Sequence, residues 1–208
     1  MSKGYRDAFP AEAWTGSGGI GRAGFLPSVP ESPSLDLMAE SREERLARFR
    51  RILEAGIHGI SFSPYLDDQA PGLEISEQQI RERLAIIRPY ARWIRTFSCT
   101  EGNQITPRVA HEMGLKTMVG IELGSDRAKN EIEFEAGVAV ARDGHADILA
   151  VGNEVLLRGD LNADEVAGYV ERARELAPGV TIGYVDAYFL FEMHPRIVDA
   201  CDVILINC

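Results

Sequence analysis

The feature that most constrains this chain is a repeated alternation of short apolar runs with longer amphipathic stretches. Six runs of strand-like composition recur, at residues 59–65, 93–98, 117–122, 146–154, 180–185 and 202–208. Between them, apolar residues recur at helical spacing, and Gly or Pro marks many of the boundaries. This alternation is typical of repeated βα units around a parallel sheet. It predicts an α/β fold, either a doubly wound open sheet or an eight-stranded barrel.

The amphipathic stretches carry helix start signals. A capping box, in which Ser or Asn precedes Glu or Gln by three positions, is expected at Ser41 with Glu44, Ser76 with Gln79, and Asn162 with Glu165. The helix that begins near residue 41 is expected to present one apolar face, made by Leu46, Phe49, Ile52 and Leu53. The helix predicted over residues 125–142 is expected to turn Ile132, Ala136 and Val140 inward.

Residues 1–40 are rich in Gly, Pro and Ser and lack a sustained period. We interpret them as an N-terminal leader, followed by one domain over residues 41–208. The segment at residues 16–24 satisfies the GxGxxG pattern, but no strand precedes it and no helix begins at it. A dinucleotide site needs both, so this segment is interpreted as a loop.

Composition excludes several classes of function. The chain has 22 basic and 32 acidic residues and a net charge of −10, which argues against a nucleic-acid partner. Cys99, Cys201 and Cys208 show no CxxC spacing and the four histidines are scattered, so no disulfide framework, metal or cofactor is expected. No apolar stretch reaches membrane-span length, and the first ten residues lack a signal-peptide core. A cytoplasmic location is expected if Met1 is the native start.

Polar and aromatic residues collect at the C-terminal ends of the predicted strands. In a parallel barrel these ends surround one mouth, where the active site lies. The set comprises Tyr65, residues 95–98, Glu122, Asn153, Glu154, Tyr184, Asp186 and Asn207. An open sheet would favour a Gly-rich phosphate loop after its first strand, and the sequence Ser-Pro-Tyr at 63–65 is not one. The barrel is therefore the preferred interpretation.

The run at residues 146–155 is apolar until it ends in Asn153 and Glu154. A buried strand with polar residues at its C-terminal end is a common way to place catalytic groups, and Glu154 is the residue we expect to be catalytic. The alternative is structural, since Glu154 could cap or pair with the turn that follows.

Four segments together carry a family resemblance: residues 59–65, 94–98, 151–155 and 203–208. They resemble glycoside hydrolase family 17, the β-1,3-glucanases and related β-glucan transglycosylases, in a bacterial form. The resemblance implies a TIM (βα)8 barrel and a retaining mechanism that uses two glutamates. Glu154 matches the general acid/base at the end of the fourth strand, and Asn153 matches the neighbour that holds the sugar 2-hydroxyl.

The remaining strand-end residues are expected to bind an oligo- or polysaccharide substrate: Tyr65, Arg95, Tyr184, Asp186 and Asn207. For each tyrosine the alternative is a buried core position. Glu122 and Asp126 are interpreted as rim residues and not as catalysts. Glu122 stands where an aromatic residue is expected in relatives, which puts the neighbouring sugar subsite in doubt.

Six strands are counted where a barrel of this class has eight. The resemblance places the nucleophile at the end of the seventh strand, beyond Cys208, so the 208-residue chain is expected to be inactive by itself and to self-associate through open edges. Within enzymes, the alternatives are a β-glucan transglycosylase or another retaining β-glycosidase. Outside enzymes, the alternative is a non-catalytic glycan-binding barrel.

Overall fold

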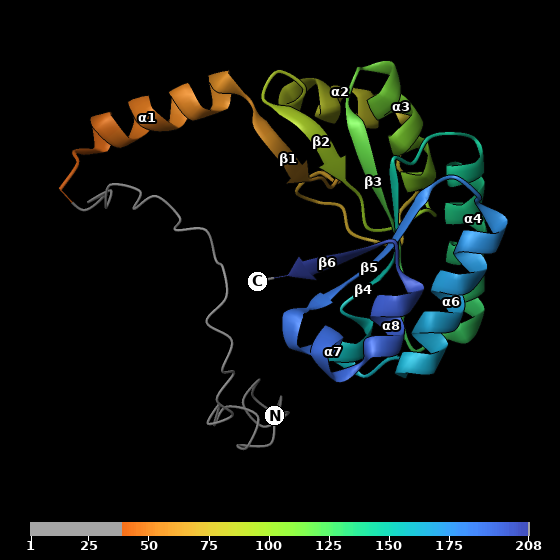
Figure 1. Ribbon diagram of the computed structural model, residues 1–208. Helices are drawn as coiled ribbons and strands as arrows, with labels where there is room; N and C mark the ends of the chain where they lie inside the picture. Colours follow the sequence, from red (N-terminus) through yellow and green to blue (C-terminus); the bar gives the residue numbers. More distant parts are fainter. Residues whose placement is uncertain (1–38, 208) are drawn as a thin grey trace, which may run out of the picture. The chain divides into compact units, whose positions relative to one another are not determined.

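The chain forms a curved sheet of six parallel strands, seen in a computed structural model that describes residues 39–207 (Figure 1). The leader segment at residues 16–24 lies outside the described residues. Residues Glu43–Cys208 form one compact unit. The strands are β1 (Ile57–Ser61), β2 (Ala91–Arg95), β3 (Lys116–Ile121), β4 (Ile148–Asn153), β5 (Thr181–Ala187) and β6 (Val203–Asn207). Each pairs with the next in sequence order, so the order never reverses as it would in a doubly wound sheet.

Helices connect the strands and cover one side of the sheet, except α1, which precedes β1 and has no buried residue (Figure 1). They are α1 (Arg42–Ala55), α2 (Glu77–Ile87), the 3-10 turn η3 (Asn103–Ile105), α3 (Thr106–Glu112), α4 (Arg127–Arg142), α5 (Val155–Arg158), α6 (Ala163–Leu176), α7 (Tyr188–Met193) and α8 (Pro195–Ala200). None of the described helices is long and apolar enough to cross a membrane. The result is a half-barrel of βα units, which confirms the predicted fold class.

Two apolar clusters hold this layer to the sheet. The larger one joins α4, α6 and α8 to the central strands, with Phe134, Val170 and Ile197 among its buried members. The smaller one packs α2 and α3 against β2, around Leu84 and Ile94. Burial of such side chains is the main favourable term in folding, at about 25 cal/mol per Å² of apolar surface.

The predicted helix starts are confirmed in part. Asn162 and Glu165 form the complete capping box of α6. At α2, Ser76 accepts a hydrogen bond from the Gln79 amide, but the Gln79 side chain donates to the Pro64 carbonyl instead of closing the box (2.9 Å). Asp126, and not Ser125, caps α4, accepting from the amides of the second and third helical residues.

The prediction that the first strand runs to Tyr65 is wrong. Strand β1 ends at Ser61, and the last bond to β2 is donated by the Phe62 amide to the Arg95 carbonyl (2.8 Å). Pro64 has no amide to continue the ladder, and its carbonyl is held by Gln79 of α2. Tyr65 therefore lies in a loop.

The predicted face of α1 is also wrong, and that of α4 is wrong at Ile132, whereas Val140 is buried and Ala136 packs against the larger apolar cluster. No residue of α1 is buried, and Phe49 is 58% exposed. In α4, Ile132 is 61% exposed, because the inward face contains Asn130 and Glu133, whose side chains bond to the loops above the sheet. Hydrogen bonds of buried polar groups, and not the apolar residues alone, set the rotation of this helix.

Strands β1 and β6 are the open edges of the described sheet, since β1 pairs only with β2 and β6 only with β5. Ile204 and Ile206 on β6 are 38% and 47% exposed. Unpaired backbone groups beside exposed isoleucines favour pairing with another chain. We expect the 208-residue chain to form concentration-dependent oligomers, measurable by light scattering after size exclusion.

Substitution Ile204→Lys should weaken this association by placing a charge on the edge strand. The control is Ile132→Lys on α4, an exposed isoleucine that lies on a helix and not on a sheet edge. A monomer at all concentrations, or equal effects of the two substitutions, contradicts association through β6.

Candidate functional site

Three strand-end side chains and Glu154 form one hydrogen-bonded cluster. The Arg95 guanidinium, at the end of β2, donates to the side-chain oxygens of Asn153 (2.5 Å) and Asn207 (3.2 Å). The Asn207 amide, at the end of β6, donates to Asn153 Oδ1 (3.1 Å) and to Glu154 Oε1 (2.8 Å). All four side chains are half-buried. The structure thus brings together four of the seven predicted site residues at one end of the sheet.

An irregularity at the end of β4 aims this cluster. Ala150 pairs with Gly183 and Asn153 with Val185, so three steps on β4 oppose two on β5. Such a bulge re-aims side chains and is common beside active sites. Gly152 has φ of 96° and Glu154 has φ of 53°, a left-handed conformation that costs a non-glycine residue about 1–2 kcal/mol. The Glu154 backbone is therefore held in a strained turn.

The environment of Arg95 sets the charge of the cluster. Burial lowers the pKa of the Arg95 guanidinium, and the charge of Glu154 opposes that shift. The guanidinium also lies over the Phe97 ring, 4.7 Å from its centroid. An arginine stays cationic under these conditions, so one fixed positive charge stands beside the Glu154 carboxylate.

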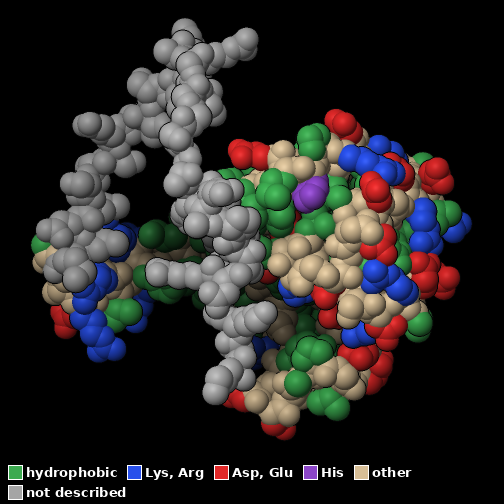
Figure 2. All heavy atoms as spheres, turned by 90° about the horizontal axis from the view of Figure 1, so that it is seen from below, with side chains coloured by type: hydrophobic (Ala, Val, Ile, Leu, Met, Phe, Trp, Pro, Cys, Tyr) green, Lys and Arg blue, Asp and Glu red, His purple; other side chains and the backbone are tan. Residues whose placement is uncertain are grey.

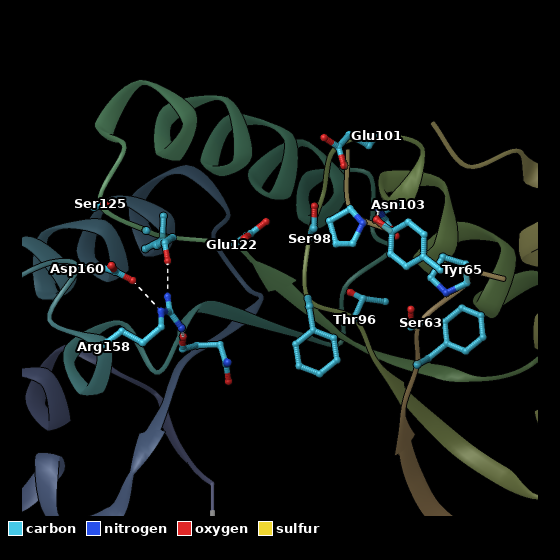
Figure 3. Close-up of a pocket in the computed structure, with 17 residues that line it drawn as sticks. Ser63, Tyr65, Thr96, Ser98, Glu101, Asn103, Glu122, Ser125, Arg158 and Asp160 are labelled. Carbon is cyan, nitrogen blue, oxygen red and sulfur yellow. Dashed lines mark hydrogen bonds and ion pairs between the residues drawn. The ribbon is translucent and has the colours of Figure 1, made fainter. Parts of the chain in front are cut away.

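A cavity of about 430 Å³ adjoins the cluster. Figure 3 shows Tyr65 and Asn103 on one side of it, Arg158 and Asp160 on the other, and Glu122 and Ser98 between them. Asn153 also lines the cavity and so connects it to the cluster. Most of its polar lining is amide, hydroxyl and carboxylate, groups that bond to neutral hydroxyl-bearing ligands.

Two loops build the wall on the Tyr65 side. The Asn103 amide donates to the Tyr65 hydroxyl (3.1 Å) and to the Thr100 carbonyl (3.1 Å). The Glu101 side chain accepts from the Gly72 amide (2.7 Å), which ties the loop after β2 to the loop after β1. These bonds hold the Tyr65 ring at the cavity, so Tyr65 stays a candidate sugar contact although it is not at a strand end.

The opposite wall depends on Arg158. Its guanidinium donates to the carbonyls of Asn153 (2.5 Å) and Leu123 (2.8 Å) and to the Asp160 carboxylate (2.7 Å). Arg158 thereby links the ends of β3 and β4. Glu122 is exposed on this side and lies 3.7 Å from Lys129 Nζ.

Tyr184 and Asp186 do not reach the mouth, and their prediction as substrate-binding residues is corrected. Both are 0% exposed. Tyr184 lies in the larger apolar cluster, with its ring 5.9 Å from that of Phe191 in α7. Successive strand residues point to opposite faces, and this pair faces the helix layer. A side chain without exposed surface has no contact available for a sugar.

Several cavity residues were not found from the sequence: Glu101, Asn103, Arg158, Asp160 and, behind the wall, Glu133. Glu133 is fully buried and accepts from Ser98 Oγ (2.6 Å) and the Cys99 amide (2.8 Å). The sequence carried one signal for Glu133: it lies at helical spacing from Asn130 and Gly137, so all three share one face of α4. The described residues contain no group of three or more His, Cys, Asp or Glu side chains that could hold a metal ion.

Surface charge is mixed over the face shown in Figure 2, where acidic and basic side chains are interspersed. Many basic groups pair with acids, as in the four-membered network of Arg81 and Arg108 with Glu77 and Glu112. Exposed pairs of this kind contribute little stability, because water screens the attraction between the charges.

Comparison with known proteins supports the fold. The half-barrel resembles a glycoside hydrolase family 17 β-1,3-glucanosyltransferase from Rhizomucor miehei, with a TM-score of 0.64 and 23% identity. It equally resembles an active-site mutant of the Rhizomucor miehei β-1,3-glucanosyltransferase in complex with laminaritriose, with a TM-score of 0.64 and 21% identity. Each likeness covers 74% of this chain and 58% of the other, so the chain spans less than two thirds of these structures.

No curated protein sequence matches the chain. A family match covers residues 59–208, which include every strand-end residue of the cluster and the complete cavity lining. The resemblance to a glycoside hydrolase family is thereby confirmed. The chain belongs to the family described as the BtgE/BtgC glycoside hydrolase domain.

Proposed function

We propose that the protein is a retaining glycosidase or transglycosylase acting on β-1,3-linked glucan, with Glu154 as general acid/base. The observation that carries the proposal is the placement of Glu154 at the end of β4, held by Asn207 and beside a cavity that Asn153 lines. A carboxyl group fixed at a barrel mouth next to a sugar-sized space suits glycosidic bond cleavage.

In this mechanism Glu154 first protonates the glycosidic oxygen of the leaving sugar. It then acts as a base and deprotonates the incoming water or acceptor hydroxyl. The Asn207 amide, which donates to Oε1, orients the carboxyl group for both steps. We propose that the nucleophile is a second carboxylate, about 5 to 5.5 Å from the acid, on a part of the barrel that follows β6. On this proposal the 208-residue chain alone has no turnover.

Substrate contacts are assigned by their place around the cavity. Asn153 is proposed to bond to the sugar 2-hydroxyl, and Arg95 fixes its side chain through Asn153 Oδ1 (2.5 Å). Tyr65 is proposed to contact an apolar face of a sugar ring, since its hydroxyl is already engaged by Asn103. The net charge of −10 suits a neutral glycan better than an anionic one.

Transfer to a sugar acceptor is favoured over hydrolysis as the outcome. The two solved structures named above are both described as β-1,3-glucanosyltransferases. The two outcomes share the covalent intermediate and differ only in the acceptor of the second step. Products longer than the starting oligosaccharide indicate transfer.

The test uses a catalytically complete form of the protein, which carries these residues with the remaining barrel, incubated with laminaritriose. We expect shorter and longer β-1,3-oligosaccharides by chromatography, and a β-anomer as the first product by NMR. Cellotriose, of equal length but β-1,4-linked, is the matched control and should remain unchanged. Binding of laminaritriose without turnover would instead support the non-catalytic glycan-binding alternative.

A further inference from the structure

The turn that carries Glu154 lacks the usual support for its conformation. Glu154 is the N-cap residue of α5, and N-cap side chains usually accept a bond from the second or third amide of their helix. Glu154 makes no such bond, because its carboxylate accepts from Asn207. Helix α5 has only four residues, too few to be stable by itself.

Tyr184 and Asp186 of β5 supply the missing acceptors. The Leu156 amide, at the second position of α5, donates to the Tyr184 hydroxyl (3.1 Å) and to Asp186 Oδ2 (3.2 Å). The Tyr184 hydroxyl donates in turn to Asp186 Oδ2. Asp186 Oδ1 accepts from the Ala187 amide (2.8 Å). Both side chains are 0% exposed, so the bonds form without competition from water.

Tyr184 also restricts the size of the residue that can stand at Gly152, where the turn begins. A Cβ atom at Gly152 would lie 3.2 Å from Tyr184 Cε2 and 2.9 Å from Val155 Cγ2. The Glu154 amide donates to the Val185 carbonyl (2.8 Å), between the two side chains on β5. The backbone on both sides of Glu154 is thus held by one short segment of β5.

We propose that Tyr184 and Asp186 are positioning residues, which hold the left-handed turn at Glu154 by capping α5 in its place. This leaves the Glu154 carboxylate free to face Asn207 and the mouth. The inference rests on the proposed function for its catalytic consequence, but the support of the turn is a property of the described residues alone.

The activity test compares Tyr184→Phe with the wild type in the catalytically complete protein. Loss of the hydroxyl removes the bond from the Leu156 amide and the bond to Asp186, and it should lower kcat on laminaritriose about tenfold, with KM unchanged. First-turnover release of the aryl group from an aryl β-glucoside should fall less than about fivefold, because a good leaving group needs little protonation. A misplaced acid thus gives a loss that depends on the leaving group.

The matched control is Tyr169→Phe, which removes the hydroxyl that donates to Glu131 in the helix layer (2.7 Å). It should leave both rates near wild type. Equal losses on the two substrates in Tyr184→Phe, or the same losses in the control, overturn the positioning role and indicate a general effect on stability.

A second measurement is independent of activity and uses the 208-residue chain. Amide hydrogen exchange of Leu156 should accelerate several-fold in Tyr184→Phe, while that of Val170 in α6 should not change. If the wild type has no glycosidase activity, the proposed function fails, and this exchange result alone decides the role of the pair. Unchanged exchange at Leu156 overturns the inference.

Discussion

Replacement of Glu154 by Gln will lower laminarin turnover by the catalytically complete protein by about 10²- to 10⁴-fold, the usual contribution of general acid/base catalysis. The amide keeps the shape of the side chain and an oxygen that accepts the Asn207 bond, so the cluster should persist. What disappears is the acidic proton that the carboxyl group donates to the glycosidic oxygen. The measurement is the initial rate of laminarin cleavage, followed by chromatography of the shorter and longer product chains, with folding checked by circular dichroism.

A second substrate with a better leaving group tests the acid role of Glu154 separately. An aryl β-glucoside with an acidic phenol needs little protonation, so its first-turnover release should be much less affected in Glu154→Gln. Glu122→Gln is the matched control, since Glu122 also follows a strand and lines the cavity but is not expected to act as catalyst. Wild-type turnover by Glu154→Gln, or an equal loss in Glu122→Gln, would refute the assignment of the acid.

Replacement of Glu133 by Ala will destabilise the chain by about 3 kcal/mol, because the buried Cys99 amide and two half-buried hydroxyls lose their acceptor at about 1 kcal/mol each. Glu133 accepts from Ser98 Oγ, the Cys99 amide and Thr100 Oγ1, and is itself 0% exposed. For a domain of this size the loss corresponds to a fall in Tm of about 10 °C. Thermal unfolding of the 208-residue chain measures it.

The control for this prediction is Glu135→Ala, two residues away on the exposed side of α4. It should change the free energy of unfolding by less than about 0.5 kcal/mol. Similar Tm values for the two variants would show that the loop after β2 does not depend on Glu133. A much lower Tm for Glu133→Ala would show that the Glu133 carboxylate holds the loop that positions Asn103 and Glu101 at the cavity.

The sequence by itself determined the architecture and the centre of the site. Short apolar runs identified six strands, and apolar residues at a spacing of about 3.6 residues identified the helices between them. Parallel strands bring their C-terminal ends to one side, so Arg95, Asn153, Glu154 and Asn207 could be placed together without coordinates. The family match over residues 59–208 agrees with the predicted family, and the hydrogen bonds between these four side chains show that they lie together.

The tertiary structure alone decided which strand-end residues face the mouth. Both faces of β5 are buried, so its sequence does not distinguish a side chain that faces the helices from one that faces the inside of the sheet, and Tyr184 and Asp186 were assigned to the wrong side. The bulge at Gly152 that aims Glu154 depends on the register between β4 and β5. Glu133 meets residues 98–100 only because α4 packs against the strands beside them. These features depend on contacts between segments distant in the sequence, and local periodicity does not encode such contacts.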